Sequence, residues 1–145
     1  MSGLTPYAVN KLIDFMFRGQ PFTPPSTYFF ALMRDDSEGG NEVSGAGYSR
    51  VGLAANMSNF SGTQAAGSTT VSSGTSGSTS NNVAIQYGTP TANWGLIAKV
   101  WVYDAETGGN CIAKGLLDVA KNVSAGDAPP LFTVSSLIFS LTESA

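Results

Sequence analysis

The sequence predicts an all-β protein, a single β-sandwich domain of jelly-roll-like connectivity over residues 26–142, with a short N-terminal amphipathic α-helix before it. Short apolar runs recur after residue 26 and are separated by turns rich in Gly, Pro and Asn, which is typical of a sandwich. One helical apolar pattern precedes them, and a long Ser/Thr/Gly-rich loop interrupts them. The length of 145 residues suits one domain, residues 1–145.

Residues 5–18 carry the signals of the helix. Thr5 is a good N-cap, Pro6 suits the first helical position, and Gly19 suits the end. Apolar residues recur on one helical face, at Val9, Leu12, Ile13, Met16 and Phe17. We predict that this stripe, including Leu12 and Phe17, is buried. It covers the protein's own sheet in the favoured interpretation and docks on a neighbouring subunit in the alternative.

The first predicted strand, residues 26–34, is apolar on both faces, because one face carries Tyr28, Phe30 and Leu32 and the other Phe29, Ala31 and Met33. A strand covered on both sides is expected inside a sandwich or at an interface. An acidic turn follows at residues 35–41. Its three carboxylates do not have the spacing of a calcium loop, so we predict a solvated turn and no metal site.

Four further strands are predicted at residues 82–87, 96–103, 110–119 and 131–142, the last with a break at 135–136. Residues 96–103 are apolar on both faces apart from Lys99, which places them in the middle of a sheet. Near the end, Leu137, Phe139 and Leu141 alternate with polar residues, as in a half-buried strand. The single cysteine, Cys111, is expected to be a structural thiol, because the chain has no histidine to activate it.

The segment 61–82 is predicted to be a flexible loop or arm. Of its 22 residues, 16 are Ser, Thr or Gly, and Val71 is its sizeable apolar side chain. Such a composition buries too little apolar area to offset the entropy lost on ordering. We therefore expect the segment to be flexible in the isolated protein and to become ordered against a neighbouring subunit.

Three motifs stand out between the strands. Residues 42–50 read E-V-S-G-x-G-Y-x-R, residues 91–95 read T-x-x-W-G, and residues 104–109 read D-A-x-x-G-G. With the helix and the strand before them, they resemble a family of small bacteriophage virion proteins that carry labels such as tail fibre protein or capsid decoration protein. The resemblance covers nearly the whole chain and implies a structural role in the virion.

Six residues are candidates for interaction with a partner: Tyr28, Phe30, Glu42, Tyr48, Arg50 and Trp94. The guanidinium of Arg50 could clamp a carboxylate, either that of Glu42 or one on a neighbouring chain. In the alternative, its stem covers Tyr48 and its charged end stays in water. Trp94 could stack on a sugar, as could Trp101, but a tryptophan beside a glycine turn more often closes the end of a sandwich.

Composition argues against several functions. The absence of histidine removes the usual general base and the Ser-His and Cys-His nucleophile pairs. A carboxylate pair for glycoside hydrolysis stays conceivable, but the acids fall in turns, in the helix or singly at strand ends. We therefore expect no enzymatic activity, cofactor or small-molecule substrate. With 12% charged residues and a net charge of −3, nucleic acid is not an expected partner. Neither a secretory signal nor a membrane span is apparent.

The resemblance implies a non-enzymatic protein that is made in the bacterial host cytoplasm and resides on the capsid surface of the virion. There it would decorate or cement the shell by bridging subunits of the major capsid protein, as a homo-oligomer and most simply a trimer. The alternative is a tail or tail-fibre component, either an adaptor or a receptor-binding knob. A carbohydrate-binding module for the host surface is a third hypothesis.

Overall fold

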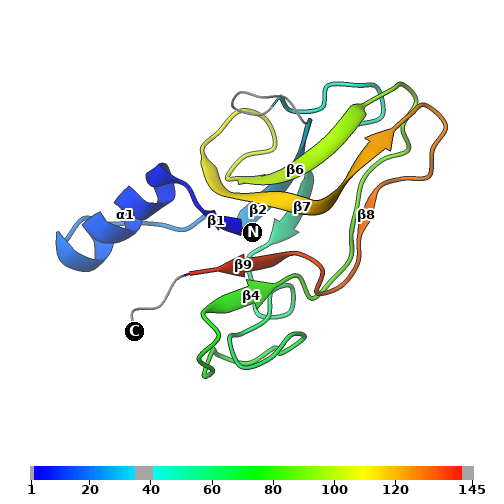
Figure 1. The fold of residues 1–145 in the computed structure, drawn as a ribbon. Coiled ribbons are helices and arrows are strands. Elements are labelled where there is room, and N and C mark those ends of the chain that lie inside the picture. The colour runs from blue at the N-terminus through cyan, green and yellow to red at the C-terminus, as the bar shows by residue number, and fades with distance from the viewer. Residues whose placement is uncertain (1, 35–40, 142–145) are drawn as a thin grey trace.

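The computed structural model describes residues 2–34 and 41–141 (Figure 1). Most of the predicted acidic turn therefore lies outside the described residues. In chain order the elements are β1 (Ser2–Leu4), α1 (Pro6–Phe17), β2 (Thr27–Arg34), β3 (Val51–Ala54), β4 (Ser78–Ser80), β5 (Ile85–Gln86), β6 (Gly95–Tyr103), β7 (Cys111–Val123), β8 (Leu131–Phe132) and β9 (Ile138–Ser140).

Five strands form one antiparallel sheet in the order β1-β7-β6-β2-β3, and two short ribbons, β4-β9 and β5-β8, complete the β structure of the described residues. The β4-β9 ribbon lies below the large sheet in the view of Figure 1. This sandwich-like arrangement with one short N-terminal helix confirms the predicted all-β class. The strand order does not confirm the jelly-roll connectivity, which stays a prediction.

One hydrophobic core joins the large sheet to the two ribbons. Phe30 and Leu32 of β2 and Val100 of β6 pack in the same cluster as Ile85 of β5 and Leu137, next to β9. Residues 30–33 of β2 are all buried, so both faces of that strand are covered, as the sequence predicts. The predicted central position of β6 is also confirmed, because β6 pairs with β7 on one side and β2 on the other.

Some strands differ from the prediction. β5 is shorter than the predicted strand at 82–87, and β7 continues to Val123, beyond the predicted end at 119. Three strands were not predicted: β1, β3 and β4. Both β1 and β4 have three residues, too few to show a period, and backbone pairing to β7 and β9 holds them in place.

The segment 61–82 is held by hydrogen bonds within the chain. The Ser61 hydroxyl oxygen accepts a bond from the backbone N–H of Ser80 at 2.9 Å, and the Thr79 hydroxyl donates to the carbonyl of Ser61 at 2.7 Å. The Gln64 amide donates to the Thr70 hydroxyl at 2.9 Å. Hydrogen bonds of polar side chains thus hold a segment that has too few apolar side chains to pack a core of its own. The predicted flexibility of the segment in solution stays a prediction.

Helix α1 projects from the sheet, attached at its N-terminal end (Figure 1). The Thr5 side chain accepts a bond from the N–H of Ala8 and donates one of 2.6 Å to the carbonyl of Cys111, and the Thr5 N–H donates to Ile112. Ala8 is the buried residue of the helix. None of the helices in the described ranges is long and apolar enough to cross a membrane.

The prediction that the stripe of α1 covers the protein's own sheet is wrong. Phe17 is 78% exposed and Met16 66% exposed, while Leu12 is half-buried. The apolar period was recognised correctly, but the sequence does not indicate that the helix leaves the sheet after its first turn.

Candidate functional site

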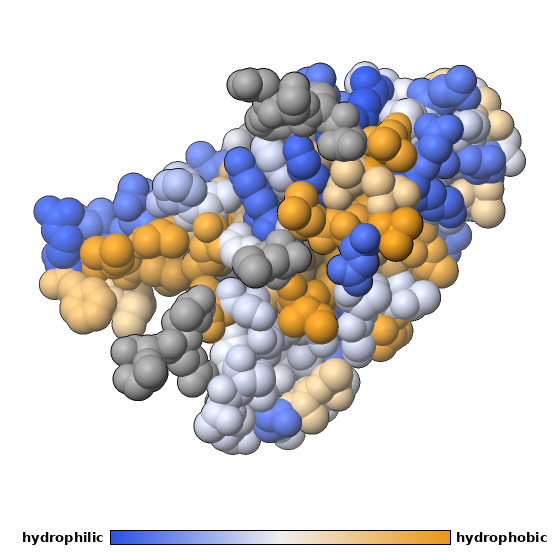
Figure 2. Space-filling model, viewed as in Figure 1, coloured by the Kyte–Doolittle hydropathy of each residue, from blue (hydrophilic) through white to orange (hydrophobic). Residues whose placement is uncertain are grey.

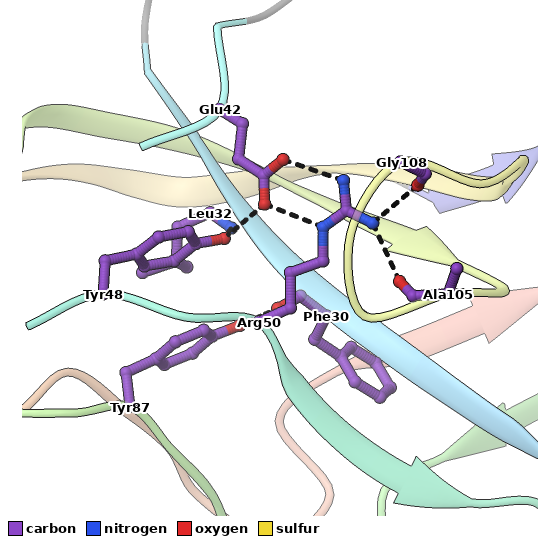
Figure 3. Close-up of polar contacts among 8 residues, drawn as sticks. All are labelled: Phe30, Leu32, Glu42, Tyr48, Arg50, Tyr87, Ala105 and Gly108. Atoms are coloured by element: carbon purple, nitrogen blue, oxygen red, sulfur yellow. Dashed lines mark hydrogen bonds and ion pairs between the residues drawn. The ribbon is translucent and has the colours of Figure 1, made fainter. Parts of the chain in front are cut away.

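The first and third sequence motifs meet at Arg50 (Figure 3). The guanidinium donates from Nε to Oε1 of Glu42 and from Nη2 to Oε2, both at 2.8 Å. Its Nη1 donates to the carbonyl oxygens of Ala105 and Gly108, each at 2.8 Å. The planar fork of arginine matches a carboxylate in this way and leaves a third nitrogen for other acceptors. We call these four residues, with Tyr48, the Arg50 brace.

Tyr48 links the brace to the sheet. Its hydroxyl donates to Oε1 of Glu42 at 2.8 Å and accepts a bond from the backbone N–H of Leu32 in β2 at 3.0 Å. Its ring lies parallel to that of Tyr87 and edge-on to that of Trp94, with ring centroids 6.2 and 5.5 Å away. The Tyr87 hydroxyl in turn donates to the carbonyl of Phe30 at 3.0 Å. Glu42 is thereby tied to the core through aromatic side chains.

Glycines in the first motif allow this close packing. Gly47 has a φ of +88°, and a Cβ there would overlap the carbonyl oxygen of Thr89. A Cβ at Gly45 would lie 2.5 Å from Cδ1 of Trp94. Trp94 is fully buried, and its indole N–H donates to the carbonyl of Ala46 at 3.0 Å. The E-V-S-G-x-G-Y-x-R segment therefore closes over the tryptophan of the T-x-x-W-G turn.

The third motif shapes the turn that offers its carbonyls to Arg50. The Asp104 carboxylate accepts bonds from the backbone N–H of Asn110 at 2.7 Å and from its side-chain amide at 3.0 Å. Gly108 and Gly109, with φ of +60° and +76°, allow the chain to reverse between β6 and β7. The ring of Tyr103 lies 3.8 Å below the guanidinium carbon and adds a cation–π contact.

The electrostatics of the brace favour its charged state. Partial burial alone would raise the pKa of Glu42, but the hydrogen bonds from Arg50 and Tyr48 outweigh it and hold that pKa below its ordinary value. The bond to Glu42 raises the pKa of Arg50. Burial raises the pKa of Tyr48 well above its ordinary value, and the bond to the Glu42 carboxylate adds to the effect. At neutral pH, Tyr48 is therefore a neutral donor to an ionised pair.

The predicted clamp of Arg50 on Glu42 is confirmed within one chain. The alternative, with the charged end in water, is wrong, because the Arg50 side chain is 6% exposed. Each of the three guanidinium nitrogens donates to a group of the same chain, and both oxygens of Glu42 accept from that chain. The brace thus joins the segment 42–50, β2 and the β6–β7 turn, and its chemistry is structural.

The other candidate residues contribute to packing. Phe30 and Trp94 are fully buried, so they present no surface to a partner or a sugar, and Trp94 closes one end of the core as the packing alternative predicted. Trp101 is half-buried, and Lys114 Nζ lies 3.8 Å from its ring centroid. Tyr28 is half-buried beside Phe60 and lines a groove. An interaction role for Tyr28 stays a prediction.

That groove was not predicted. It has a volume of about 480 Å³ and lies between α1, β1, the large sheet and the β4-β9 ribbon. Its walls are mostly apolar and include Leu4, Leu12, Phe22, Ile112 and Phe139. Figure 2 shows apolar residues running along α1 toward the body of the molecule. Its lining comes from segments far apart in the sequence, so no local pattern indicates it.

The motifs that resemble those of small bacteriophage virion proteins thus lie in a sandwich-like fold, where the first and third build an internal brace. The comparison with protein families agrees: the model of the podophage GP4 fiber I protein gp80 matches residues 3–140. The chain belongs to this family and is a structural protein of the phage virion. No curated protein matches the chain.

Proposed function

We propose that this protein is a non-enzymatic subunit of a fibre on the phage tail and that it acts as a homo-oligomer. The observation that carries the proposal is the match to a fiber I protein over residues 3–140. The description of the family as a fibre protein favours the tail-fibre hypothesis over the capsid-cementing role that the sequence motifs first suggested. A trimer is the oligomer that the resemblance implies.

The brace supports a mechanical role. Arg50 joins parts of the chain that are 8, 55 and 58 residues away from it, through charged hydrogen bonds. Such bonds resist separation more than neutral ones. A subunit held in this way transmits load between neighbours without opening. The Glu42 and Arg50 groups are committed to one another, which also favours a structural function over catalysis.

Counting the copies in purified virions tests the proposal. Quantitative mass spectrometry of this protein against the major capsid protein is expected to give the small number of copies that a tail appendage needs, and immunogold labelling is expected to mark the tail. Hundreds of copies with label over the shell would contradict the fibre role. They would favour instead a capsid protein that bridges major capsid subunits.

A further inference from the structure

We draw no further inference here: the strongest candidate, the apolar groove of about 480 Å³ between α1, β1, the large sheet and the β4-β9 ribbon, is a surface for which nothing in the structure shows what covers it.

Discussion

Arg50 has a small exposed surface and a large number of partners. Its three nitrogens donate to a carboxylate and two backbone carbonyls, and its plane lies over Tyr103. A buried charge is costly unless it is paired and hydrogen-bonded. The brace satisfies this condition, so the identity of this residue should matter more than its charge.

Arg50→Lys tests this expectation. A lysine retains the charge, but its single ammonium cannot reach both oxygens of Glu42 and the two carbonyls together. We expect a loss of roughly 1–3 kcal/mol in the free energy of unfolding, because buried acceptors lose their donors. Urea denaturation measures it. Arg18→Lys, in the exposed pair with Asp14, is the control and is expected to stay within about 0.5 kcal/mol. Equal effects of the two substitutions would show that the brace contributes no more than a surface ion pair.

The pKa of Glu42 predicts a pH dependence. Because this pKa is lower in the folded protein than its ordinary value of 4.5, the unfolded chain binds the proton more readily. The stability from the pair is therefore fully present above about pH 4.5 and is lost as the pH falls through the folded pKa. Glu42→Gln should be less stable than the wild type at about pH 7, and the difference should shrink at about pH 3. Urea midpoints at the two pH values decide it, and a constant difference would exclude this linkage.

At the scale of elements, α1 depends on Thr5. The buried hydroxyl of this residue caps the helix and bonds the strand beside it, so it sets where the helix leaves the sheet. Thr5→Ala is expected to cost roughly 1–3 kcal/mol, from a lost cap and an unpaired carbonyl of Cys111. Thr5→Ser keeps the hydroxyl and should cost less. Thermal unfolding of both variants measures the difference, and equal losses would assign the effect to the methyl group.

The elements that the sequence predicts well are those whose side chains carry a clear period. β2 and β6 are apolar on both faces, and α1 has caps and a helical stripe, so these were predicted nearly to their ends. β1 and β4 contain mainly Ser, Thr and Gly, and they depend on partners more than 50 residues away, which no local pattern shows. The direction in which α1 points is also set by contacts between residues far apart in the sequence, such as the bond from Thr5 to Cys111.

The same distinction holds within the brace. Glu42 and Arg50 lie eight residues apart in one motif, and the pair was predicted as one of the alternatives for Arg50. The carbonyls of Ala105 and Gly108 have no side-chain signature as acceptors, and only the folded turn brings them to Arg50. Backbone partners of this kind cannot be recognised from residue types.

At the scale of the whole molecule, the segment 61–82 is predicted to differ in its susceptibility to proteolysis between the free protein and the virion. Residues 71–76 are exposed, and loops of this kind are preferred sites of proteolysis. We expect a protease of broad specificity to cut free protein first within this stretch. The prediction that a neighbouring subunit orders the segment implies slower cleavage there in virion-bound protein. Mass spectrometry of the fragments identifies the sites. Equal resistance in the two forms would show that the hydrogen bonds inside the chain are sufficient.

The attachment of α1 by its first turn alone has a consequence for how such proteins diverge. Folding depends on the core and the brace, while the last turn of the helix lies outside both. Substitutions there can change the exposed surface of the helix without a penalty in stability, and one inserted residue in the helix would rotate the residues after it by about 100°. The surface that α1 presents can therefore evolve at a few positions in a scaffold that remains constant.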